Sequence, residues 1–156
     1  MLGVGYWLAA LLFIDTTVSE SAENITDTAE NGQYTIISEG MFVDADGFHK
    51  GEGMAKLIKT GEKYFVRFED NFKVTNGPDL FVYFGKEGRY AKEAQLAALK
   101  GNIGAQNYEV PEGVDPTQYS EVWIWCHAFS VPFAHAVLEE VSVHPSPQPL
   151  PLESEN

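Results

Sequence analysis

The sequence has few of the residues and motifs that mark a catalytic or metal-binding protein. Its single cysteine, Cys126, cannot form an internal disulfide, so the cysteine count assigns no redox compartment. No segment matches G-x-S-x-G, a phosphate-binding loop, H-E-x-x-H or C-x-x-C, which leaves no signature of a hydrolase, a nucleotide-binding protein or a zinc protein. Because no acid, base and nucleophile converge along the chain, we do not expect an independent enzyme.

Basic residues are also scarce. The chain has 10 Lys and Arg against 23 Asp and Glu, a formal net charge of −13, and no basic residue precedes Lys50. A surface this acidic repels phosphate backbones and anionic lipid headgroups. The composition therefore argues against a nucleic-acid partner and against polybasic membrane docking, and it favours solubility.

The amino-terminal residues 1–14 are uncharged and mostly apolar. A helix of this length spans about 21 Å, less than the roughly 30 Å hydrocarbon core, and it lacks the basic start of a secretory signal. It could be the end of a membrane anchor, an atypical signal segment or a core helix. Residues 15–32 are polar and acidic without an apolar period, which predicts a solvated tether. Because no Lys or Arg follows the apolar segment, we favour a short or truncated anchor that holds an extracytoplasmic domain.

Residues 33–143 consist of short runs of β-branched and aromatic residues separated by turn signals such as Asp-Gly and Asn-Gly. This spacing predicts an all-β single domain, an antiparallel β-sandwich or a barrel-like fold. Residues 89–100 are ambiguous, since their propensity favours a helix but a short strand at residues 96–99 also fits. Residues 144–156 contain four prolines and predict a disordered, extended tail.

The run at residues 121–129 is expected to form the central strand. At period two, one face of this run carries Val122, Ile124, Cys126 and Ala128. The opposite face carries Trp123, Trp125, His127 and Phe129. A strand that is apolar on both faces belongs inside a packed sheet rather than at its edge.

Cys126 is the first candidate for chemistry. A reactive thiol needs a neighbouring cation, a helix amino terminus or a metal. The neighbours of Cys126 on its own face are the apolar Ile124 and Ala128. The residues alone therefore predict an inert, buried cysteine.

His127 and His135 are the second candidates. A hairpin centred on Val131 would place the two histidines opposite each other, with β carbons about 5 Å apart, near enough to share a metal ion. A bulge at Pro132 would shift this register. Two ligands do not complete a site, and the next carboxylate on that face is Glu139, so we expect a structural or solvent-facing pair and no metal.

Several runs of the sequence, taken in order, resemble the pattern of the DM-thirteen domain, which is often labelled an electron-transfer domain: residues 42–51, 68–72, 76–80, 99–104 and 122–133. The resemblance extends over about residues 39–138. It implies a small all-β extracytoplasmic domain, and the layout of this chain is similar to that of anchored single-domain bacterial proteins. It further implies that the Trp125-Cys126 pair is the redox element.

Two hypotheses for the function follow. In the first, an anchored extracytoplasmic domain takes part in electron transfer through Cys126, with Trp123, Trp125, His127 and His135 as binding residues around it. In the second, the chain is a non-catalytic ligand-binding or protein-binding β-module of the cell envelope, and Cys126 is a buried structural residue. The sequence selects no cofactor. Because the chain has one thiol, redox chemistry would need a bound cofactor or an envelope partner.

Overall fold

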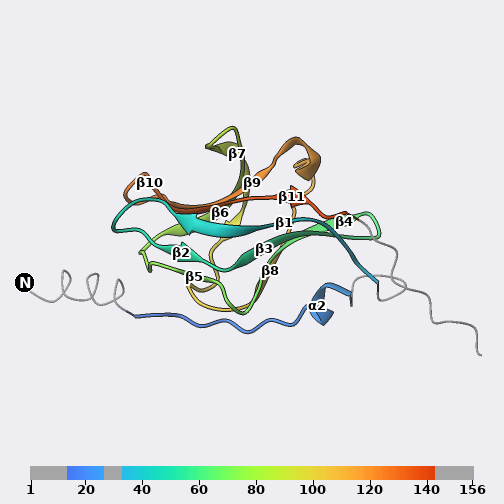
Figure 1. The fold of residues 1–156 in the computed structure, drawn as a ribbon, viewed down its shortest axis with the longest axis horizontal. Helices are drawn as coiled ribbons and strands as arrows, with labels where there is room; N and C mark the ends of the chain where they lie inside the picture. Colours follow the sequence, from blue (N-terminus) through green and yellow to red (C-terminus); the bar gives the residue numbers. More distant parts are fainter. Residues whose placement is uncertain (1–13, 27–32, 143–156) are drawn as a thin grey trace, which may run out of the picture.

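The computed structural model describes residues 14–26 and 33–142, so the expected tail at residues 144–156 and all but the last residue of the apolar segment lie outside it. In the described part the one α-helix is α2 (Glu23–Thr26), and η1 (Pro116–Gln118) is a 3-10 helix. The strands form an antiparallel sheet that curls into a half-barrel (Figure 1). Its main strands pair in the order β7 (Arg89–Ala98), β6 (Leu80–Lys86), β9 (Glu121–Cys126), β10 (Val131–Val137), β1 (Thr35–Asp44), β3 (Met54–Thr60), β4 (Lys63–Phe68) and β8 (Gln106–Glu109).

Three two-residue strands complete the described β-structure. β11 (Glu139–Glu140) pairs with β1, and β2 (Gly51–Glu52) pairs with β5 (Lys73–Val74). The arrangement confirms the predicted all-β antiparallel class. Across residues 14–26 and 33–142, none of the helices has both the length and the apolar character needed to cross a membrane.

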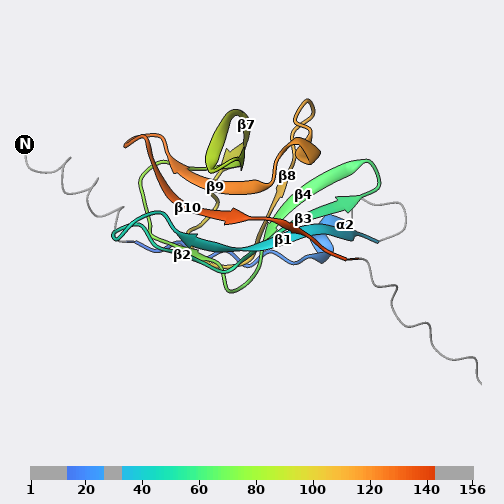
Figure 2. The ribbon, with the colours of Figure 1, turned by 45° about the horizontal axis from the view of Figure 1, so that its top comes forward.

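The central position predicted for the strand at residues 121–129 is confirmed. β9 lies between β6 and β10, and Figure 2 shows β10 in turn beside β1. The strand is shorter than predicted, because it ends at Cys126 and residues 127–130 form the turn to β10. Ser130 closes this turn with a φ of 51°, a left-handed conformation typical of turn residues.

The hydrophobic core lies on the concave side of the sheet. Val122, Ile124 and Cys126 on β9 have 0% exposure and belong to this core. Across it, the ring of Phe42 on β1 meets that of Phe68 on β4 edge to face, with centroids 5.0 Å apart. Alternation along each strand thus buries one face of the whole sheet, which is the main source of its stability.

Residues 89–98 form a strand and not the helix that their propensity favours. Along β7, the buried positions include Ala91, Ala94 and Leu96, all of which join the core. Pairing with β6 supplies the ladder hydrogen bonds, and the register shifts between Tyr83 and Gly85 let β7 bend over the sheet. Tertiary packing therefore outweighs local propensity here.

Residues 14–26 form a strap along the domain, drawn in blue below the sheet in Figure 1. The Val18 amide donates to the Ile103 carbonyl at 2.8 Å, and the Glu20 amide donates to the Ala105 carbonyl at 2.8 Å. Ile25 has 0% exposure and packs in a second apolar cluster with residues of β3 and β4. The prediction of a solvated tether is wrong for this part of the segment, because backbone hydrogen bonds and one buried isoleucine attach it to the sheet.

Candidate functional site

β9 places Cys126 and its aromatic neighbours on opposite sides of the sheet. The Cys126 thiol is free and buried, and its residue faces Leu80 of β6 and Val131 of β10 in the two ladders. Ile124 lies beside it on the same core face. The predicted burial of this cysteine is confirmed, and no part of it reaches solvent.

The opposite side of the sheet carries what we call the outer aromatic face: Phe81, Tyr83, Tyr90, Trp123, Trp125, His127 and His135. The rings of Tyr90 and Trp125 stack with centroids 4.0 Å apart, and Tyr90 meets Tyr83 edge to face at 5.1 Å. Phe81 and His127 stack at 3.9 Å. These offset and edge-to-face contacts are the geometries in which aromatic rings attract one another.

Tyr83 lies at the centre of the outer aromatic face and is 4% exposed. Its hydroxyl hydrogen-bonds to Nε2 of His127 and lies 2.8 Å from Oε1 of Gln95. The pKa of Tyr83 is raised, first because burial penalises the phenolate and then through the charges of Tyr90 and Asp79. The phenol is therefore held in its protonated form.

His127 follows β9 in the turn, where its residue is exposed to solvent. Its backbone amide donates to the Asp79 carbonyl at 3.0 Å, which ties the turn to the start of β6. The stack on Phe81 and the hydrogen bond with the Tyr83 hydroxyl fix the ring. One edge of this imidazole thus faces a buried phenol while the residue itself meets water.

Trp123 and His135 form the other part of the outer aromatic face. Their rings stack at 4.5 Å, and the indole Nε1 of Trp123 donates to Oε2 of the buried Glu121 at 2.9 Å. The indole lies against Gly85, where an added β carbon would come within 2.5 Å of it. Nδ1 of His135 is buried, and it is the one buried side-chain polar atom in the described residues without a hydrogen-bond partner. Packing therefore holds this histidine.

The predicted pairing of His127 with His135 is wrong. His135 lies opposite Trp123 in the β9–β10 ladder, and the register shifts between Pro132 and Ala134. The two histidines instead stack on different aromatic partners. Among residues 14–26 and 33–142, no group of three or more His, Cys, Asp or Glu side chains could hold a metal ion.

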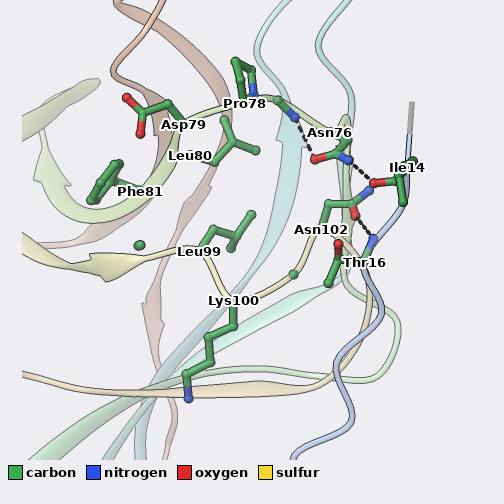
Figure 3. A pocket seen from close by; sticks show the side chains of 13 residues that line it. Ile14, Thr16, Asn76, Pro78, Asp79, Leu80, Phe81, Leu99, Lys100 and Asn102 are labelled. Atoms are coloured by element: carbon green, nitrogen blue, oxygen red, sulfur yellow. Dashed lines mark hydrogen bonds between the residues drawn. The ribbon is translucent and has the colours of Figure 1, made fainter. Parts of the chain in front are cut away.

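A pocket of about 330 Å³ opens beside the outer aromatic face, with Phe81 in its lining (Figure 3). The strap forms one wall, where the Thr16 backbone amide donates to Oδ1 of Asn102 at 2.7 Å and the Asn76 side-chain amide donates to the Ile14 carbonyl. None of the site residues predicted from the sequence, which are Cys126, Trp123, Trp125, His127 and His135, lines this pocket. It marks the junction of the strap with the domain.

Sequence reasoning missed three residues that complete the outer aromatic face from β6 and β7: Tyr83, Tyr90 and Gln95. It also missed the role of Glu121, on β9 itself, as the hydrogen-bond partner of the Trp123 indole. The alternation of side chains along residues 80–84 places Phe81 and Tyr83 on one face, and this pattern could have identified Tyr83 from the sequence. The pairing of β6 with β9 joins segments far apart in the chain. Nothing in the local pattern specifies that pairing.

The fold and the site define a small antiparallel β-domain whose chemistry-bearing groups are a buried lone thiol and a packed layer of aromatic rings. The family model for electron transfer DM13 matches residues 41–138, and the chain belongs to this family. The match confirms the family resemblance seen in the sequence motifs and supports a redox or electron-transfer role for the domain. No curated protein and no solved structure was found to match the chain.

Proposed function

We propose that the protein is an electron-transfer domain, held at a membrane on the extracytoplasmic side, that exchanges electrons with a redox partner of the cell envelope. The family match over residues 41–138 is the observation that carries this proposal. The outer aromatic face adds support, because tryptophan and tyrosine are among the side chains that one-electron oxidants can oxidise. The apolar residues 1–14 and the absence of basic residues before Lys50 support the placement at a membrane.

Cys126 is the redox residue that the family pattern implies, and we keep it in that role within the proposal. Its burial limits the chemistry that it can perform. A mixed disulfide requires a thiolate to reach the sulfur, which β6 and β10 prevent while β9 stays in place. Cys126 would thus act either through an opening of the sheet or by electron exchange without a covalent step.

The test is electron exchange between the purified full chain and small one-electron mediators of graded potential, followed by voltammetry. We expect reversible exchange in the wild type and its loss or a shifted potential in Cys126→Ala. Equal exchange by both proteins would remove Cys126 from the mechanism. If the wild type exchanges no electrons with any mediator, the electron-transfer proposal is refuted.

A second candidate function has an observation in its favour. The 0% exposure of Cys126 and its place in the core are what a structural cysteine would show. In that case the domain is a non-catalytic module that binds a ligand or a protein of the cell envelope. Crosslinking in whole cells separates the two, because a binding module should capture the same partner in wild type and Cys126→Ala.

The proposed anchoring is tested on the full-length chain in cells. We expect the protein in the membrane fraction, with its domain accessible to protease added from the extracytoplasmic side. Removal of residues 1–14 should release the domain into the soluble fraction. A wild-type chain that stays soluble would contradict the anchor.

A further inference from the structure

We infer that Tyr83 and His127 form a one-electron redox site, in which Tyr83 gives up an electron while His127 accepts the phenolic proton. The inference rests on the proposed electron-transfer function and adds to it a second redox site, besides Cys126. That site lies on the outer aromatic face, on the opposite side of the sheet from Cys126. It makes Tyr83 the oxidised residue and His127 its base.

The geometry meets the main requirement for oxidising a tyrosine, a base in contact with the phenol. An oxidised phenol is a strong acid, so the electron leaves readily only where the proton can leave with it. The Tyr83 hydroxyl is hydrogen-bonded to Nε2 of His127, and the residue as a whole is 4% exposed, which limits water as a competing base. The hydroxyl donates to Oε1 of Gln95 at 2.8 Å, and Nε2 of His127 is the neighbouring nitrogen that can take the proton once the phenol is oxidised.

The step balances in atoms and charge. One electron passes from Tyr83 to a one-electron oxidant, which in the cell is a metal-centred or flavin-type redox partner. The O–H bond of Tyr83 breaks, and the proton forms an N–H bond at Nε2 of His127. The products are a neutral tyrosyl radical and an imidazolium, and reduction by one electron returns the proton to the phenol.

The surroundings of the pair provide routes for the electron and for the positive charge. Tyr90 contacts Tyr83 at 5.1 Å and stacks on the half-buried Trp125 at 4.0 Å, so a continuous aromatic path leads to the edge of the outer aromatic face. Trp123 lies directly opposite Tyr83 in the ladder. Because the His127 residue is exposed, water can solvate the imidazolium.

Other charged groups near Tyr83 bear on the pH dependence of the step. The titratable groups that act on Tyr83 in the described residues are His127, Tyr90 and Asp79. Burial and the latter two groups raise the pKa of Tyr83, which keeps the phenol protonated before oxidation.

The experiment oxidises the full chain with a photogenerated ruthenium(III) polypyridyl complex and identifies the radical by electron paramagnetic resonance. We expect a neutral tyrosyl radical in the wild type, its loss in Tyr83→Phe and its retention in Tyr34→Phe, a matched change at an exposed tyrosine. In His127→Gln the radical should form more slowly. Circular dichroism of each variant verifies that the sheet is intact.

The pH profile separates a base from a merely structural histidine. In the wild type, formation of the radical should be slower in acid than near neutral pH, because an imidazolium cannot accept the phenolic proton. His127→Gln should lose this pH dependence. The inference is overturned if Tyr83→Phe keeps the wild-type radical, or if His127→Gln keeps the wild-type rate and pH profile.

The outcome for the site is distinguishable from the outcome for the proposed function. If the mediators exchange electrons with Tyr83→Phe as well as with wild type, the domain transfers electrons by another residue and this inference is wrong. If no protein exchanges electrons with the mediators although the Tyr83 radical forms under photo-oxidation, the proposed function is refuted while the chemistry of the pair stands.

Discussion

Cys126 is expected to react with a thiol reagent several thousand-fold more slowly in the native protein than in the unfolded chain. The residue has 0% exposure, and β9 is paired along its whole length with strands on both sides. Access to the sulfur requires β9 to separate from its neighbours and the core to open, so the opening costs close to the full free energy of unfolding. The low end of the free energy of unfolding for a domain is about 5 kcal/mol, and each 1.36 kcal/mol slows the reaction tenfold. The native labelling rate should therefore be lower than the unfolded rate by a factor of roughly 10³ to 10⁴.

The assay follows the labelling rate of the full chain in increasing urea. We expect the rate to rise with a slope close to the m-value of equilibrium unfolding, as global opening requires. A Val137→Cys variant made in a Cys126→Ala background provides the control, because Val137 is 52% exposed and a thiol there should react near the unfolded rate. Native labelling of Cys126 within tenfold of the unfolded rate would refute the burial argument and favour an accessible redox thiol.

Three further predictions test the structure around the site. In urea melts, Ile124→Ala should lower the free energy of unfolding by about 2 to 5 kcal/mol, because it leaves a cavity in the core. Trp125 is half-exposed, so Trp125→Ala should lower it by less, roughly 1 to 3 kcal/mol. Equal losses would contradict the assignment of the two faces of β9. Gly101→Ala places a β carbon 2.5 Å from a strap carbonyl and should speed hydrogen exchange of the strap amides, whereas Gly47→Ala, with no atom within 4 Å, should leave exchange unchanged. Asp46 should titrate by NMR at about 2 instead of 3.8, because the imidazole three residues later and two backbone amides stabilise the carboxylate. Its contribution to stability is present above pH 3.8 and disappears as the pH falls toward 2, and Asp46→Asn should remove it.

The sequence indicated the central strand because residues 122–126 are apolar on both faces, as a strand in the middle of a packed sheet requires. It also specified the burial of Cys126, since the period-two pattern assigns the thiol and the indoles to opposite faces. The sequence pattern did not predict the register in which β9 pairs with β10. The turn at residues 127–130 takes His127 out of the ladder, and the shift next to Pro132 moves His135 opposite Trp123.

Other parts of the structure depend on contacts that no local pattern encodes. Ile25 is one buried residue in a polar segment, and a single apolar residue has no period to detect. Residues 89–98 have helical propensity, yet pairing with β6 makes them a strand. Tyr83 and His127 meet because β6 pairs with β9, a long-range choice that local sequence does not determine.

The place of β10 between β9 and β1 also determines when this domain can fold. Phe42, near the end of the first long strand, pairs with Ala136, close to the end of the domain, so the sheet cannot close until nearly all of the chain is available. During synthesis β1 and β9 would each have an edge without β10, and such edges invite pairing between chains. Contacts this distant in sequence also make folding slow. A ribosome that stalls before Val131 would therefore release a chain prone to aggregation, not a stable amino-terminal fragment.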